Sequence, residues 1–235
     1  MLNLFQKLSL MAKGIKKPLV KKSVPLKKKG STPALSKPLD YTKIKGVFVG
    51  SGSDGLNEAE VRDQIVSLTG KKKTSDINVL YIGTATYDLD GPRQRQTVRF
   101  KEAGCKIHSL DCALVKPNKK KLEAALKNKD VIIISGGNSL YAVDRLKKLG
   151  VGQMIEEAVK RDRTILSGGS AGALCWFDAG HSDSMDPATY KDAMLGATFT
   201  DESQVGGGKN KKWKYIRIPM FGFLPGLVAP HHDKV

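Results

Sequence analysis

The segment 164–173, Thr-Ile-Leu-Ser-Gly-Gly-Ser-Ala-Gly-Ala, holds the side chain best suited to do chemistry in this sequence. A short apolar run precedes Ser170, small residues flank it, and a helix-forming run follows. The pattern Gly-x-Ser-x-Gly is typical of a nucleophile elbow, a sharp strand-to-helix turn that exposes a serine hydroxyl above a parallel sheet. Small neighbours are needed because the turn crowds the backbone. Ser170 is therefore the candidate nucleophile, and the alternative is a plain glycine-rich connection between strand and helix.

A serine hydroxyl becomes a good nucleophile only when a base accepts its proton. His231 follows the apolar run 227–229 at the end of an expected strand, where such a base belongs, and the alternative is an ordinary strand-end histidine. Acyl transfer also needs N–H donors for the developing oxyanion. The backbone amides of Ala171 and Gly137 are the candidates, although the loop that contains Gly137 also reads as a helix start capped by Asn138.

Short β-branched runs alternate with amphipathic stretches from Tyr41 onward. The predicted strands are 46–50, 78–82, 105–110, 131–134 and 164–167. The predicted helices are 57–69, 119–127, 138–148 and 151–161, together with one that runs through 97–100 and ends near 104. This alternation favours a parallel sheet with helices on both faces. In such sheets, sites gather at the carboxyl ends of the strands. Beyond the elbow helix we expect a polar loop at 181–187, a solvated turn at 206–212, and final apolar runs at 214–219 and 227–229.

Composition limits the class of protein. The 235 residues suit one domain, and the 40% hydrophobic content and 24 glycines fit a globular α/β protein. No apolar run approaches the ~20 residues of a membrane-spanning helix, so we expect no membrane partner. The three cysteines (Cys105, Cys112 and Cys175) lack metal-ligand spacing and predict reduced thiols in an intracellular compartment. We accordingly expect no metal site.

The net charge of +17 is concentrated at the N-terminus. Residues 1–39 contain ten lysines, four prolines and no acidic residue, which predicts a flexible lysine-rich tail over residues 1–40. The segment 1–11 has apolar residues at helical spacing, as a mitochondrial presequence would, but lacks arginine. The lysine run 21–29 lacks aromatic residues that could stack on bases, so nucleic acid ranks last as a partner. We expect a cytoplasmic protein, with mitochondrial localisation as the alternative.

Three motifs together resemble the site motifs of peptidase family S51, the serine peptidases that include dipeptidase E and cyanophycinase. They are Ile-Ser-Gly-Gly-Asn-Ser-Leu (134–140), Gly-Gly-Ser-Ala-Gly-Ala (168–173) and Ala-Pro-His-His-Asp (229–233). Their order and spacing agree with the family, and the resemblance covers residues from about 44 to 235. It implies a peptidase domain over residues 41–235. The implied fold is a three-layer α/β sandwich with a mostly parallel central sheet, like that of class I glutamine amidotransferases.

The resemblance also implies roles for individual residues. Ser170 would be the nucleophile and His231 the general base, Gly137 and Ala171 would supply the oxyanion N–H groups, and Asn138 would lie beside the substrate. The implied reaction is hydrolysis of small peptides, including aspartyl dipeptides, through an acyl-enzyme and without a metal or organic cofactor.

The sequence departs from the family after the histidine. Family members continue there with further strands, which carry the acidic residue that orients the histidine, so we expect these C-terminal strands to be missing. Asp183 resembles an alternative acidic partner, and a carboxylate that caps its own turn is the other interpretation.

The leading hypothesis is therefore a serine-type peptidase that acts on small peptides. The alternatives are a catalytically impaired relative that acts as a binding protein, an esterase of the α/β-hydrolase type, and last a nucleic-acid-binding protein. A homo-oligomer is left open.

Overall fold

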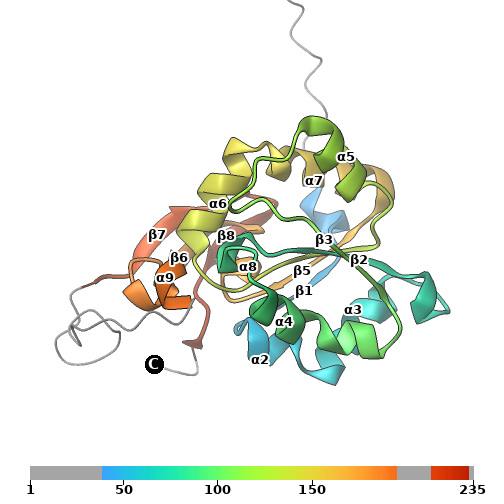
Figure 1. Ribbon diagram of the computed structural model, residues 1–235. Helices are drawn as coiled ribbons and strands as arrows, with labels where there is room; N and C mark the ends of the chain where they lie inside the picture. The colour runs from blue at the N-terminus through green and yellow to red at the C-terminus, as the bar shows by residue number, and fades with distance from the viewer. Residues whose placement is uncertain (1–38, 195–212, 233–235) are drawn as a thin grey trace, which may run out of the picture. The chain divides into compact units, whose positions relative to one another are not determined.

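The computed structural model describes residues 39–194 and 213–232 (Figure 1). Residues 1–38 of the tail expected over residues 1–40, and the turn expected at 206–212, lie outside the described residues. In the described part, the main sheet has five strands, and every neighbouring pair is parallel. These strands are β1 (Gly46–Val49), β2 (Asn78–Ile82), β3 (Lys106–Ser109), β4 (Val131–Ile134) and β5 (Ile165–Gly169), in the spatial order β1-β5-β4-β2-β3.

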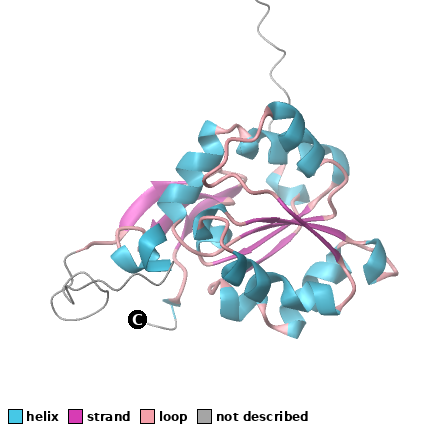
Figure 2. Cartoon of the chain, in the orientation of Figure 1, coloured by secondary structure: helices cyan, strands magenta, loops and turns pink. Residues whose placement is uncertain are grey.

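Helices cover both faces of this sheet (Figures 1 and 2). One face packs against α2 (Ser53–Leu56), α3 (Ala59–Leu68) and α4 (Asp90–Glu102), and the other against α5 (Lys119–Leu126), α6 (Ser139–Lys148) and α7 (Val151–Asp162). Successive side chains of a strand point to opposite faces. Accordingly, Ile132 and Ile134 join the core on the α5–α7 side, whereas Val131 and Ile133 join the core on the α2–α4 side. The predicted three-layer sandwich with a parallel central sheet is confirmed.

A second, three-stranded sheet follows the elbow region. After the short helix α8 (Ala171–Leu174), it comprises β6 (Phe177–Ser182), β7 (Ile216–Pro219) and β8 (Leu224–Val228) in the order β7-β6-β8. Strand β6 was not predicted, and its end overlaps the expected polar loop at 181–187. Its buried residues, Ala179, Gly180 and Ser182, are small or polar, so they give no apolar signal in the sequence.

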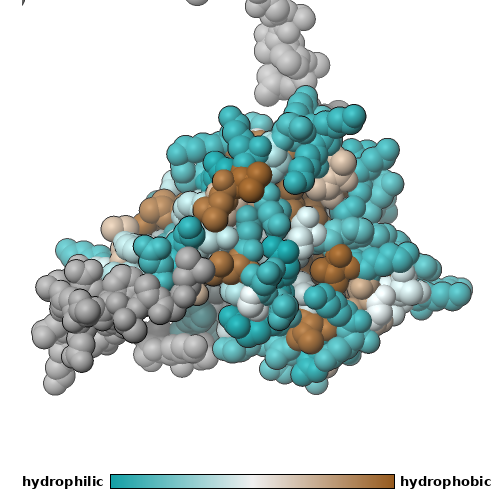
Figure 3. Space-filling view, in the orientation of Figure 1, coloured by the Kyte–Doolittle hydropathy of each residue, from teal (hydrophilic) through white to brown (hydrophobic). Residues whose placement is uncertain are grey.

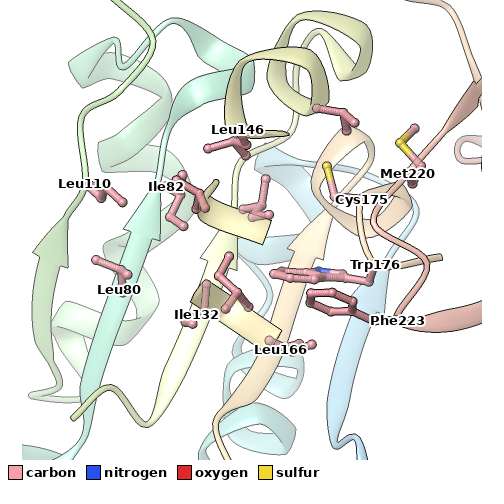
Figure 4. Close-up of a cluster of buried hydrophobic side chains, with 14 of the residues drawn as sticks. Leu80, Ile82, Leu110, Ile132, Leu146, Leu166, Cys175, Trp176, Met220 and Phe223 are labelled. Atoms are coloured by element: carbon pink, nitrogen blue, oxygen red, sulfur yellow. The ribbon is translucent and has the colours of Figure 1, made fainter. Parts of the chain in front are cut away.

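Trp176 packs the start of this second sheet against the core of the main sheet (Figure 4). Its ring is fully buried and lies 5.9 Å, centroid to centroid, from Phe223. Its indole N–H donates a hydrogen bond of 3.1 Å to the carbonyl oxygen of Ser167 on β5. Trp176 thereby connects β5 to the points where β6 and β8 begin.

Short 3-10 helices complete the described chain: η1 (Tyr41–Lys43), η2 (Thr74–Asp76), η3 (Thr84–Thr86) and η4 (Pro187–Thr189), followed by α9 (Lys191–Met194). Figure 3 shows a mainly hydrophilic face with scattered hydrophobic residues. Within the described ranges, no helix has the length and apolar character needed to cross a membrane. Nor does that part of the chain contain a cluster of three or more histidine, cysteine or acidic residues placed to hold a metal ion.

Candidate active site

Ser170 occupies a sharp turn between β5 and α8. Its backbone dihedral angles are φ 51° and ψ −118°, a combination that a residue with a side chain rarely adopts. Its N–H donates to the carbonyl oxygen of Val49 at 3.0 Å, and its own carbonyl accepts from the amides of Ala173 and Leu174 at 2.9 and 3.1 Å. These bonds hold the strained backbone in place and leave the side chain half-buried at the wall of a cavity.

Glycines let the loops around Ser170 approach one another backbone to backbone. A Cβ added at Gly172 would lie 1.9 Å from the carbonyl oxygen of Ile134, and one at Gly169 would lie 2.2 Å from that of Ser51. No side chain fits at such distances. The loops that follow β1, β4 and β5 can therefore converge only because these positions lack a Cβ.

His231 reaches the same turn from the segment after β8. Its Nε2 lies 2.8 Å from the Oγ of Ser170, so the two side chains are hydrogen-bonded. The other ring nitrogen, Nδ1, is buried and has no hydrogen-bond partner in the described part of the chain. The neighbouring His232 is exposed.

Asp183 makes no hydrogen bond to the Nδ1 of His231, since that nitrogen has no hydrogen-bond partner in the described part of the chain. The backbone carbonyl of Asp183 instead accepts a hydrogen bond of 2.7 Å from the amide of Asp186, within the turn that follows β6. The assignment of Asp183 as the acid that orients the histidine stays a prediction.

The backbone amides of Ala171 and Gly137 are the oxyanion donors predicted from the sequence. Neither the N–H of Ala171 nor that of Gly137 donates a hydrogen bond within the described ranges. Gly137 has φ +125°, and a Cβ there would lie 2.2 Å from the carbonyl oxygen of Ala85, so only glycine fits this conformation. Gly137 lines the same cavity as Ser170, whereas Ala171 is buried and is not part of its lining, and the oxyanion role of both amides stays a prediction.

Asn138 differs from the sequence-based expectation that it lies beside the substrate. It is only 4% exposed, does not line the cavity, and caps α6 by accepting a hydrogen bond of 2.9 Å from the amide of Tyr141. Its side-chain amide donates to the carbonyl of Ser184 and the hydroxyl of Thr189, at 3.0 and 2.9 Å. The side chain is committed to the capping role and to the loop behind the cavity, which leaves it no free contact for a ligand.

The cavity has a volume of about 650 Å³ and lies at the carboxyl ends of the parallel strands. Its lining comprises residues 51–54 after β1, Thr86, residues 89–92, Arg95 and Gln96 around the start of α4, Gly136 and Gly137 after β4, Ser170, Met194 and His231. The charged members Asp54, Asp90 and Arg95 lie outside the three sequence motifs. The available signal was that the loop 51–54 follows a predicted strand at the same edge of the sheet.

Burial sets the protonation of other groups near the site. Burial raises the pKa of the Cys175 thiol, under α8, to about 12, so this thiol stays protonated and unreactive at neutral pH. Burial also raises the pKa of the Asp88 carboxyl, which accepts a hydrogen bond of 2.6 Å from the amide of Ala113.

Residues 47–234 match the family model described as Peptidase family S51. The chain belongs to peptidase family S51. The family membership predicted from the three motifs is therefore confirmed.

Curated proteins and solved structures are similar to this S51 chain. It is 29% identical over 219 residues to a Trypanosoma brucei brucei protein named G2/mitotic-specific cyclin-1, covering 83% of this chain and 63% of that protein. It is 26% identical over 166 residues to the uncharacterised peptidase YgaJ of Bacillus subtilis (strain 168), covering 71% of this chain and 59% of that protein. The chain thus spans about three fifths of the length of these curated relatives.

The structural neighbours are more distant. A peptidase E protein from Listeria monocytogenes EGD-e has a TM-score of 0.47 and 15% identity, covering 75% of this S51 chain and 98% of that chain. A peptidase from an acI-B1 actinobacterium has a TM-score of 0.48 and 21% identity, covering 59% of each chain.

Proposed function

We propose that this S51 family member is a serine-type peptidase that hydrolyses short peptides. The observation that carries the proposal is the hydrogen bond of 2.8 Å between the Oγ of Ser170 and the Nε2 of His231. The strained backbone at Ser170 supports it further, since a nucleophile elbow places its serine in this kind of strand-to-helix turn. Strain is retained at such positions because it presents the hydroxyl to substrate.

The chemistry follows from the positions of the atoms. As the Oγ of Ser170 attacks the peptide carbonyl carbon, the Nε2 of His231 accepts its proton, and the anionic carbonyl oxygen accepts hydrogen bonds from the amides of Gly137 and Ala171. His231 then gives that proton to the departing amine as the C–N bond breaks, which leaves an ester on Ser170. Water attacks this ester while His231 accepts a proton from the water and returns it to Ser170.

The Nδ1 of His231 is where a triad acid would act. A hydrogen bond at that nitrogen fixes the tautomer in which Nε2 can accept a proton, and losing it has cost ~10⁴ in turnover in a serine protease. Asp183 remains our candidate from the sequence for this role. Its replacement by asparagine is therefore an informative variant.

The cavity suggests the class of substrate. Its charged lining residues are the carboxylates Asp54 and Asp90 and the guanidinium of Arg95. These groups are complementary to the ammonium and carboxylate ends of a short, unblocked peptide. We therefore include dipeptides and tripeptides in the proposal. A preference for aspartyl dipeptides stays a prediction from the family resemblance.

A peptide-library assay tests the proposal. The purified protein is incubated with mixtures of dipeptides and tripeptides, and products are identified by mass spectrometry. We expect cleavage that disappears in Ser170→Ala and persists in the control Ser67→Ala, whose hydroxyl lies on the exposed face of α3. Equal cleavage by wild type and Ser170→Ala would remove Ser170 from the mechanism.

The unpartnered Nδ1 of His231 favours a second candidate function, a catalytically impaired relative that binds peptides. This alternative predicts that the wild-type protein binds peptides from the same library in calorimetry and cleaves none of them. Cleavage that depends on Ser170 excludes it.

A further inference from the structure

Gln96 on α4 is a buried polar residue at the wall of the cavity. The side chain is only 2% exposed, yet it lines the same cavity as Ser170 and His231. Its Oε1 accepts hydrogen bonds from the backbone N–H of Gly136, at 3.2 Å, and from the hydroxyl of Tyr81, at 3.3 Å. A buried amide oxygen with two donors is well satisfied, so this end of the side chain is held firmly.

The orientation of the Gln96 amide group follows from its partners. A backbone N–H can only donate, so the atom that faces Gly136 must be the oxygen. Burial raises the pKa of Tyr81 to about 12, so its hydroxyl keeps its proton and can act as the second donor. The nitrogen end therefore points the other way, toward Gly52, where an added Cβ would lie 3.6 Å from Nε2.

The Nε2 atom of Gln96 has no hydrogen-bond partner within the described ranges. It is absent from the fully buried side-chain atoms that lack a partner there, so it is not fully buried. Gly52, beside it, also lines the cavity. The N–H groups of Gln96 are thus accessible from the cavity, where they can donate to an oxygen atom of a bound molecule.

The hydrogen bond to Gly136 matters because of what adjoins it. Gly136 and Gly137 are consecutive glycines, which have unusual backbone freedom, and Gly137 lines the same cavity as Ser170. A Cβ at Gly136 would lie 2.9 Å from the Cα of Gly52, so no side chain of its own can anchor this loop. The amide oxygen of Gln96 supplies that anchor from the neighbouring helix.

We propose that Gln96 is a positioning residue for the oxyanion loop and that it offers its amide N–H to an oxygen of the bound peptide. The inference rests on the proposed serine-peptidase function. It assigns to α4 a part in transition-state stabilisation that the three sequence motifs do not contain. Because Oε1 holds Gly136, the N–H of Gly137 stays directed at the reacting carbonyl.

The test uses a fluorophosphonate, a probe that needs no known substrate. Ser170 attacks its phosphorus, fluoride leaves, and His231 takes the proton, so the labelling rate depends on the same oxyanion donors. The maximal labelling rate and the half-saturating probe concentration are measured separately by intact-protein mass spectrometry. In Gln96→Leu we expect the maximal rate to fall by about tenfold to a hundredfold, because the loop donor is no longer held in place. The control Gln94→Leu, at an exposed position on the same helix, should label like wild type.

A second variant keeps the proposal testable if Gln96→Leu does not fold. In Gln96→Glu an ionised carboxylate has no donor and places negative charge beside the oxyanion loop, whereas a protonated carboxyl again has one acceptor and one donor oxygen. We therefore expect the labelling rate of this variant, relative to wild type, to rise as the pH falls from 8 to 5. A residue with a merely structural role would give a constant ratio.

The outcomes separate the two hypotheses. Wild-type protein that takes no label on Ser170 overturns the proposed function and this inference with it. Labelled wild type together with a folded Gln96→Leu variant of equal rate overturns the inference alone, as does a pH-independent ratio for Gln96→Glu.

Discussion

Replacing Gly137 by alanine tests the oxyanion loop most sharply. The added Cβ would lie 2.2 Å from the carbonyl oxygen of Ala85, at a residue whose φ is +125°. Carbon and oxygen atoms approach to about 3.3 Å at closest, so the backbone must move by roughly 1 Å to relieve the contact. The amide of Gly137 moves with it.

Two separate costs follow from this displacement. Loss of one oxyanion donor lowers kcat by ~10²–10³, which corresponds to about 2.7–4 kcal/mol in the transition state. The forced dihedral angles cost about 1–3 kcal/mol in the free energy of unfolding. The Gly137→Ala variant should therefore fold with a lower Tm and turn over at most about one hundredth as fast as wild type.

The assay is steady-state hydrolysis of 4-nitrophenyl acetate, a general acyl donor, with Tm measured in parallel. The matched control is Gly70→Ala, because Gly70 also has positive φ (+69°) but no atom within 4 Å of the added Cβ. This control should lose stability and keep its activity. A folded Gly137→Ala variant with activity within threefold of wild type would refute the assignment of this amide to the oxyanion hole.

Three further predictions concern charge, strain and acid dependence. Arg95→Gln should raise KM for peptides with a free C-terminal carboxylate by up to about fivefold, which corresponds to the free energy of an exposed ion pair. KM for C-terminally amidated peptides should not change. An equal effect on both kinds of peptide would contradict the contact between Arg95 and the carboxylate. Ser170→Gly should be more stable than Ser170→Ala by about 1 kcal/mol in urea unfolding, since glycine accepts the positive φ that alanine does not, and equal stability would show that the turn stores no strain. The Tm of Asp88→Asn should increase relative to the Tm of wild type as the pH rises. Burial raises the pKa of this carboxyl in the folded state, so wild type loses stability as the pH rises from the unfolded-state pKa to the higher folded-state pKa. A Tm difference between the two proteins that does not change with pH would contradict the raised pKa.

The layered fold could be predicted from the sequence because its strands carry a strong local signal. The run Val131–Ile134 is apolar throughout, as a strand covered on both faces must be, and the structure places it inside the main sheet. Strand β6 could not be predicted in the same way. Its buried positions hold Ala179, Gly180 and Ser182, which become recognisable as a strand only through their pairing with β7 and β8.

The same distinction applies to the site. The small residues around Ser170 predict the nucleophile, and the apolar run before His231 predicts the base. The structure brings the two side chains together across 61 positions. Gln96 carried no such signal, because a glutamine in a charged helix reads as a solvent-exposed residue until tertiary packing shows it buried. Asn138 showed the converse: its motif suggested a ligand contact, whereas its hydrogen bonds are all made within the protein.

The most direct test of the central claim is to trap the acyl-enzyme. Wild-type protein is mixed with 4-nitrophenyl acetate, quenched in acid within the first turnover, digested and mapped by mass spectrometry. We expect an acetyl group on the peptide that contains Ser170. This acetyl group should form far more slowly in His231→Gln and should be absent from Ser170→Ala. An acetyl group found on another residue, or formed equally fast without the imidazole of His231, would contradict it.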